Sequence, residues 1–353
     1  MAVEPQSWLP VVDIAPFRDG NAEARSTVAT QIDRACRDVG FLAITGHGLD
    51  AATQERMLSA VDAFFALSEE VKQRYSPADK RHNRGYAGFG QEALAYSLGV
   101  DTPPDMFEAF NVGTPLPAGH DDDPYYATER DRFFVDNVWA SEVPAMREAW
   151  MAYFGECERI AAQFDEMFAV ALDVPLHFFR ERTGRAANLL RVNHYQRHEQ
   201  HGASLPGQMR MGAHTDYGMC TILLADPVPG LQIHLDGEWR DVVPQPGTLL
   251  VNLGDLIAEW TNDRWRSTLH RVVPAPSDTT GPFRRRSLAF FHEANYDTVV
   301  ATIPSCIDAD HPAKYPPVVA GEHLMAKLMG PRSLSKTDAV QTTAASRAEI
   351  TGL

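Results

Sequence analysis

The chain has 353 residues, of which 44% are hydrophobic and 22% charged, a balance typical of globular proteins rather than disordered ones. Lys and Arg total 32 against 47 Asp and Glu, so the net charge is 32 − 47 = −15. This acidic surplus argues against a nucleic-acid partner, because binding to phosphates relies on Lys and Arg. No segment approaches the roughly eighteen consecutive apolar residues of a membrane-spanning helix.

The N-terminal segment and the cysteines indicate the compartment. The first ten residues have no basic start and no long apolar stretch, so a secretory signal is not expected. The four cysteines lie far apart, with neither paired metal-site spacing nor the density of a disulfide framework. We therefore expect a protein of the reducing cytoplasm that is a monomer or a weak homo-oligomer and binds no membrane.

Residues 1–125 are predicted to form an N-terminal region of helices and short strands. Leu9 to Ile14 is expected to be an opening strand, and residues 41–44 a second short apolar strand. Apolar residues three and four apart predict helices around residues 28–39 and 57–65. Residues 76–124 are rich in Pro, Gly, Asp and aromatic residues, and we expect them to form a long surface excursion.

Residues 126–334 are predicted to form the main body of the protein. A long helix is expected from about Glu142 to Leu172, and short β-branched or apolar runs follow after Pro175. The predicted fold class is mainly β with flanking helices, a double-stranded β-helix (jelly roll) braced by the long helix. Residues 335–353 are expected to be a flexible tail. The predicted strands lie at residues 189–195, 220–224, 231–234, 248–251, 269–273 and 287–292.

A candidate metal site begins with His214 and Asp216, which are two residues apart. In an extended segment, side chains at positions i and i+2 point to the same side, so both can face one ion. His270, on a later predicted strand, would complete a facial set of two imidazoles and one carboxylate, which is typical of Fe(II) oxygenases. Taken alone, the His-x-Asp pair is more typical of a surface turn.

The order of several motifs reverses this preference, because the chain resembles the isopenicillin N synthase-like family of Fe(II)/2-oxoglutarate-dependent dioxygenases. The resemblance runs from about Leu9 to Leu328. It rests on motifs at the start, centre and end of this range: Leu9–Ile14, Ala35–Phe41, Gly46-His47-Gly48, His214-Thr215-Asp216, Gly230-Leu231-Gln232, Val251–Asp255, Asn262–Val272 and Arg285-x-Ser287.

The resemblance implies that His214, Asp216 and His270 bind Fe(II), with 2-oxoglutarate as cosubstrate and O2 as oxidant. The far carboxylate of 2-oxoglutarate would be held by Arg285 and Ser287, which are two apart on one strand, since Arg offers a fork to a carboxylate. Arg284 and Arg286 are adjacent alternatives, but only Arg285 has Ser at i+2. The family pattern adds Asn193 and Tyr195 as further cosubstrate contacts.

The implied reaction is oxidation of a small organic metabolite, as in secondary metabolism. The family hydroxylates, desaturates or cyclises through an Fe(IV)-oxo species, and releases succinate and CO2. Asp216 argues against halogenation, because halogenating relatives have a small residue there.

Substrate contacts are expected from the 76–124 excursion and from the C-terminal segment, which would cover the open end of the barrel. Arg191 faces the same side as Asn193 and either neutralises an acidic substrate or forms a structural ion pair. Other candidate substrate contacts, each an alternative to plain packing, are Tyr217, Phe89, Tyr96, Phe107, Phe110 and Phe291.

Two rival functions remain at this point. An oxidase of the same fold would take all its electrons from its substrate, and release of succinate or CO2 would distinguish it. A catalytically silent binding protein would be expected to have lost part of the ligand set, yet His214, Asp216, His270, Arg285 and Ser287 are all present.

Overall fold

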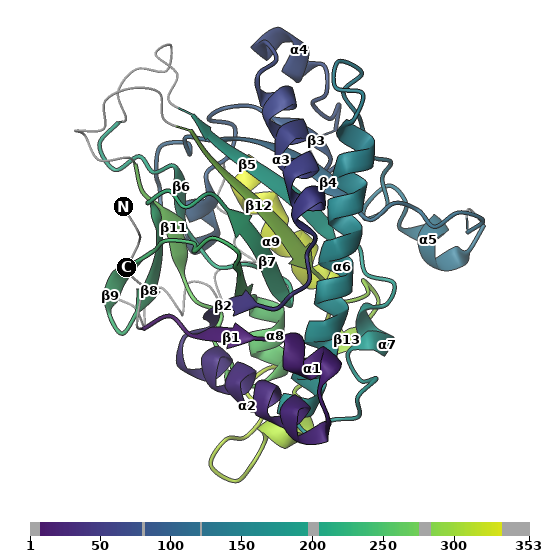
Figure 1. Cartoon of the computed structure of the whole chain (residues 1–353), viewed down its shortest axis with the longest axis vertical. Helices are drawn as coiled ribbons and strands as arrows, with labels where there is room; N and C mark the ends of the chain where they lie inside the picture. Colours follow the sequence, from purple (N-terminus) through teal and green to yellow (C-terminus); the bar gives the residue numbers. More distant parts are fainter. Residues whose placement is uncertain (1–7, 80–81, 121, 197–204, 275–283, 334–353) are drawn as a thin grey trace.

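The computed structural model describes residues 8–79, 82–120, 122–196, 205–274 and 284–333. Two β-sheets form its centre (Figure 1). The larger sheet has eight strands in the order β1-β2-β10-β7-β12-β5-β4-β3. Its strands, in that order, are Val11–Asp13, Phe41–Thr45, Leu249–Leu253, Cys220–Ala225, Arg284–His292, Leu189–Gln196, Glu108–Gly113 and Gly85–Ala87.

The smaller sheet has four strands in the order β6-β11-β8-β9 and lies to the left of β7, β12 and β5 in Figure 1. Every strand pair in the two sheets is antiparallel except β1 with β2. Together they form the predicted jelly roll. The small-sheet strands are Met211–His214, His270–Val272, Leu231–Leu235 and Glu238–Val242.

Three helices cover one face of the larger sheet: α2 (Ala22–Asp38), α3 (Ala51–Phe65) and α6 (Met146–Ala171) (Figure 1). Helix α6 confirms the predicted long bracing helix. Its apolar side chains recur at helical spacing, so one stripe packs on the sheet and on α2 and α3. Trp150 and Phe154 are fully buried there, and Phe154 packs edge-on against Phe290 of β12.

A second core fills the space between the two sheets. It includes Phe41, Tyr195, Met211, Ile233 and Leu250. Because side chains alternate across a strand, β5 and β12 present one set of residues to the helices and the other set to this interior. The six predicted strands between residues 189 and 292 are confirmed, with ends shifted by a few residues.

The expectation of a surface excursion over residues 76–124 is wrong for its central part. Residues 85–87 form β3, and residues 108–113 form β4, which pairs with both β3 and β5 and is buried along its whole length. Sheet pairing on both sides satisfies the backbone of β4, so this segment can be buried despite its polar surroundings. The opening strand is also shorter than expected, because α1 (Ala15–Asp19) follows it directly.

The remaining elements are short, except for the last helix. They are α4 (Glu69–Gln73), η1 (Leu94–Leu98), α5 (Pro124–Thr128), α7 (Arg180–Thr183), α8 (Asp255–Trp260), η3 (Pro304–Cys306), and the two-stranded ribbon of β13 (Val299–Val300) and β14 (Val318–Val319). Helix α9 (Ala320–Ser333) closes the described chain, and the expected tail lies outside the described residues. Within the described ranges, no helix is long and apolar enough to cross a membrane.

Candidate metal centre and cosubstrate pocket

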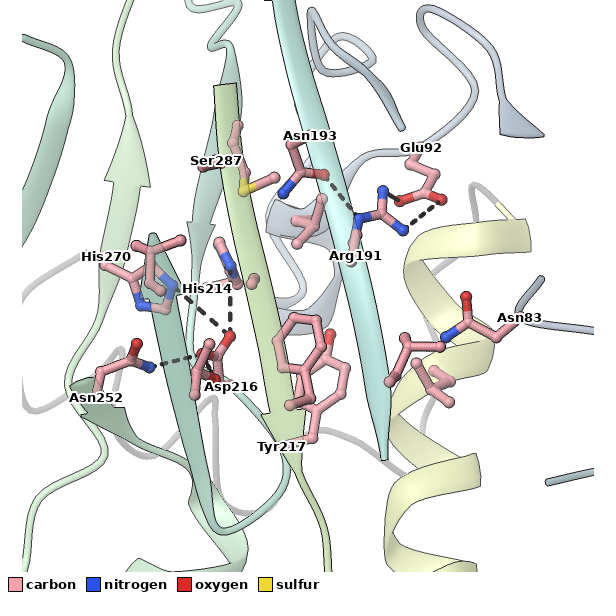
Figure 2. Close-up of a pocket in the computed structure, with 18 of the residues that line it drawn as sticks. Asn83, Glu92, Arg191, Asn193, His214, Asp216, Tyr217, Asn252, His270 and Ser287 are labelled. Carbon is pink, nitrogen blue, oxygen red and sulfur yellow. Dashed lines mark hydrogen bonds and ion pairs between the residues drawn. The ribbon is translucent and has the colours of Figure 1, made fainter. Parts of the chain in front are cut away.

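Two imidazoles and one carboxylate meet at the end of the small sheet. His214 ends β6, His270 begins β11, and the two residues pair directly in the sheet. Asp216 follows His214 by two residues, and its Oδ1 lies 3.9 Å from His214 Nε2 and 3.7 Å from His270 Nε2. One atom from each residue lies within 4.8 Å of the others, so a single ion can contact all three (Figure 2).

Both imidazoles are oriented for metal binding through Nε2. The Nδ1 atoms lie 2.8 Å from the Gly212 carbonyl oxygen for His214 and 3.2 Å from the Thr268 carbonyl oxygen for His270. An Nδ1–H donating to a carbonyl fixes the tautomer that leaves Nε2 unprotonated, as in many metal sites. Burial, with the nearby His270, lowers the pKa of His214 to about 3, so its ring is neutral as a ligand must be.

The carboxylate of Asp216 is held from the opposite side by two donors that the sequence analysis did not assign. Asn252 of β10 donates to Oδ2 at 2.6 Å, and the Thr221 hydroxyl of β7 donates to the same oxygen. With Oδ2 engaged, Oδ1 faces the two histidines (Figure 2). Asn252 lies in the Val251–Asp255 motif, but its role depends on strand order, which sequence spacing does not reveal.

The predicted cosubstrate residues lie side by side on β12 and β5. Arg285 pairs in register with Tyr195, and Ser287 with Asn193. The Arg285 side chain is only 1% exposed, yet its Nε and Nη1 have no hydrogen-bond partner within the described residues. A buried guanidinium with unused donors is costly unless an anion completes it. This arrangement fits a carboxylate of an extended ligand.

Arg191 forms the structural ion pair that the sequence left open. Its Nη2 lies 2.8 Å from Glu92 Oε2, and its Nε donates to Asn193 Oδ1 at 2.8 Å (Figure 2). The guanidinium also lies over the ring of Phe107, 5.2 Å from its centroid. Glu92 therefore shares the cavity wall with Arg191 as a neutral pair.

Of the predicted substrate contacts, Tyr217 and Phe291 line the same cavity as the metal cluster. Phe110 instead packs between Phe64 and Trp150 on the helix side of the sheet, with ring-centroid distances of 4.7 and 5.3 Å. Phe107 is buried against Tyr195. Phe89 lines a separate groove. These three residues and Tyr96 are not among the residues that line the cavity, so the structure does not place them beside the metal-ligand candidates.

The cavity has further wall residues that the sequence did not identify individually. Helix α9 supplies Leu324, Met325 and Leu328, which agrees with the expected contribution of the C-terminal segment. On this helix, Lys327 donates to Asp255, which also accepts from the Thr215 hydroxyl at 3.1 Å, so α9 is linked to the segment that carries Asp216. Glu293 also lines the cavity, and burial together with the Asp216 carboxylate raises the pKa of Glu293 to about 8.

Fold and site together define a jelly-roll protein in which two histidines and one aspartate could hold one metal ion, in a cavity that also contains a buried arginine. Family models agree: residues 9–142 match the N-terminal region described as non-haem dioxygenase in morphine synthesis, and residues 186–294 match the 2OG-Fe(II) oxygenase superfamily. The chain belongs to the 2OG-Fe(II) oxygenase superfamily, in its isopenicillin N synthase-like branch.

Relatives of known class cover most of the chain. The 2-oxoglutarate-Fe(II) type oxidoreductase hxnY of Emericella nidulans is 34% identical over 315 residues, covering 88% of this chain and 86% of that protein. Validamycin A dioxygenase of Streptomyces hygroscopicus subsp. limoneus is 34% identical over 321 residues, with 90% and 85% covered.

A solved structure shows the same fold with a cosubstrate bound. A full-length Neurospora crassa protein, solved in complex with alpha-KG and 5-formyluracil, matches with a TM-score of 0.77 at 26% identity, covering 93% of this chain and 98% of that one. The protein described here is thus an Fe(II)- and 2-oxoglutarate-dependent dioxygenase, and the cosubstrate-independent oxidase is not favoured.

Proposed function

We propose that this dioxygenase oxidises a C–H bond of a small organic metabolite, with iron held by His214, Asp216 and His270. Hydroxylation is the basic outcome, and desaturation or ring closure are its variants. The observation that carries the residue assignment is the convergence of one ligand atom from each of the three side chains within 4.8 Å. Asp216 occupies the carboxylate position, so we do not propose halogenation.

The cosubstrate subsite of the proposal is Arg285 with Ser287, Tyr195 and Asn193. The unused Nε and Nη1 donors of buried Arg285 support it, because the far carboxylate of 2-oxoglutarate would complete them. When bound, iron and 2-oxoglutarate supply the activation of oxygen. The chain itself positions the metal-binding side chains. For example, Phe41 packs edge-on against His270, with 5.4 Å between the ring centroids, and this contact fixes the orientation of the imidazole.

The wider setting stays a prediction as well. We propose a cytoplasmic enzyme of secondary metabolism, a monomer or weak homo-oligomer without a nucleic-acid or membrane partner. Among the similar proteins, one is named for validamycin A and one was solved with 5-formyluracil. These are small molecules of different chemistry, which supports a small organic substrate without naming it. The net charge of −15 supports the exclusion of nucleic acid.

Anaerobic titration with Fe(II) and 2-oxoglutarate tests the proposal. The wild-type protein is expected to develop the weak visible charge-transfer band of a chelated Fe(II) complex, whereas Asp216→Ala and His270→Ala are expected to lose it. His311→Ala is the matched control, because this histidine is exposed and lies outside the cavity. A band of undiminished strength in either ligand variant would contradict the proposed metal site.

Succinate release separates the proposed reaction from an oxidase reaction. A screen of metabolites under air is expected to identify compounds that increase succinate production by the wild-type protein. Substrate oxidation without any succinate would contradict the proposed role of Arg285 and its neighbours.

A further inference from the structure

A buried carboxyl group faces the cavity at the end of β12. Glu293 continues the inward-facing row of Arg285, Ser287, Ala289 and Phe291, all of which line the cavity. Its side chain is buried, with the residue 8% exposed, and its backbone N–H is held by Asn188 Oδ1 at 3.0 Å. The carboxyl group lies directly over Gly218, where a Cβ atom would come within 2.3 Å of Glu293 Oε2.

Within the described residues, this carboxyl group accepts no hydrogen bond and forms no ion pair. Apart from Arg285, the other charged groups of the cavity wall are engaged: Glu92 pairs with Arg191, Arg132 with Glu129, Asp216 accepts from Asn252, and Arg84 donates to three backbone carbonyls. Burying a carboxyl group without a hydrogen-bond partner is costly, so a residue kept for stability alone would be expected to have one. The position instead suits a group that a ligand completes.

We propose that Glu293 determines substrate specificity by binding a protonated amine of the substrate. This inference rests on the proposed function of the same cavity and names the class of substrate. Burial and the Asp216 carboxylate raise the pKa of Glu293, so its ionised form needs a ligand that brings a positive charge. An ammonium group supplies both that charge and hydrogen-bond donors, whereas a hydroxyl group supplies no charge.

The position of Glu293 also orders the two ligands along the cavity. Arg285 and Glu293 are eight positions apart in one inward-facing row, so they lie at opposite ends of it. Glu293 contacts Gly218, which is two residues from the metal-binding Asp216. The anionic cosubstrate thus binds at the cationic end, and the amine of the substrate binds at the acidic end.

The test is anaerobic titration of the Fe(II)- and 2-oxoglutarate-loaded enzyme with matched compounds that differ only in the amine. The probes are benzylamine against benzyl alcohol and cyclohexylamine against cyclohexanol. In the wild type, the amines are expected to perturb the charge-transfer band with at least about 10-fold tighter affinity than the alcohols. Glu293→Gln is expected to weaken the amines by about 100-fold and leave the alcohols and the 2-oxoglutarate titration unchanged.

The outcomes separate the inference from the function on which it rests. If Fe(II) and 2-oxoglutarate produce no band in the wild type, the proposed site fails. If the band forms but no amine perturbs it, or amines and alcohols bind alike, or Glu293→Gln retains the preference, the amine inference is overturned and the proposed function stands.

Thermal unfolding adds a readout that needs no substrate. Because the Glu293 carboxyl group has no partner within the described chain, Glu293→Gln is expected to leave the Tm unchanged or raise it. Glu108→Gln is the matched control, since Glu108 is a buried glutamate with partners in Lys72 and His194, and its loss is expected to lower the Tm. A clear fall in Tm for Glu293→Gln would assign Glu293 a structural role and overturn the inference.

Discussion

The two faces of strand β12 differ in whether their charged side chains have partners within the protein. On the helix side, Arg286 is bound by Asp226 and Asp62, and His292 lies 2.9 Å from Asp165 of α6. On the cavity side, Arg285 Nε and Nη1 have no hydrogen-bond partner in the described residues, and the carboxyl group of Glu293 lies against Gly218. The fold therefore pairs Arg286 and His292 itself, whereas Arg285 is left for a ligand.

The same contrast extends to the neighbouring strands. Glu108 of β4, which faces α3 and α4, accepts from Lys72, Tyr86 and His194, so this buried carboxylate is fully paired. Proteins satisfy nearly all their buried polar groups, so the exceptions require an explanation. Among the exceptions in the described residues, Arg285 is a charged group in the cavity wall, whereas Trp150 Nε1 and Tyr153 Oη lie on α6. The charge and the position of Arg285 are the reason for placing an anionic ligand in the cavity.

The largest expected effect follows from removing the unused guanidinium. Arg285→Gln is expected to weaken 2-oxoglutarate binding by about 1,000-fold, because one partner of a buried charge pair is lost. The stability of the ligand-free protein is expected not to fall, since Arg285 Nε and Nη1 bind nothing within the described residues. Titration of the charge-transfer band gives the affinity, and urea unfolding gives the stability.

Arg286→Gln is the matched control on the opposite face. It is expected to destabilise the protein by about 1–3 kcal/mol, because Asp226 and Asp62 lose a charged donor. Binding of 2-oxoglutarate is expected to stay unchanged. If both variants lost affinity equally, the distinction between the two faces of β12 would be wrong.

The second prediction concerns the paired carboxylate on the helix side. Burial alone would raise the pKa of Glu108, but hydrogen bonds from His194 and Lys72 outweigh it and lower the pKa from the ordinary value of 4.5 to about 2. Glu108→Gln is expected to lower the free energy of unfolding by about 3 kcal/mol at neutral pH, because it breaks a buried charge pair. Cosubstrate affinity is expected to remain.

The pH dependence of this difference follows from the direction of the shift. A depressed pKa in the folded state stabilises the protein above about pH 4.5, and this contribution is lost as the pH falls from 4.5 towards 2. The gap in unfolding free energy between wild type and Glu108→Gln is therefore expected to be constant near neutrality and to narrow in acid. A gap that widened in acid would refute the ionised pairing of Glu108.

The site residues that could be predicted from the sequence are those that depend only on spacing along one extended segment. Residues two apart share a face, so the convergence of His214 with Asp216 and the common wall of Arg285, Ser287 and Phe291 could be predicted. The residues that could not be predicted depend on which strands are neighbours. Asn252 reaches Asp216 from β10 across a distance of 36 residues in the chain.

Aromatic residues of β4 and of the segment before it show a second limit. Phe107 and Phe110 lie in a polar, Pro- and Gly-rich region, which suggested loop contacts with a substrate. The strand is instead paired on both sides, and Phe110 packs into the helix-side core. Composition does not reveal such pairing, because it arises from β3 and β5, which lie far from β4 in the sequence.

The smallest expected effect comes from the two donors to Asp216 Oδ2, Asn252 and Thr221, when one of them is removed. Asn252→Ala removes the 2.6 Å hydrogen bond that holds Asp216 Oδ2, leaving the Thr221 hydroxyl as a donor to that oxygen. Iron affinity is expected to fall about 10- to 100-fold, as for other residues that orient metal ligands. Titration with Fe(II) at saturating 2-oxoglutarate measures it, and high iron is expected to restore the full band. Unchanged iron affinity would mean that Thr221 alone orients Asp216, whereas loss of the band at any iron concentration would mean that Asn252 is required for more than orientation.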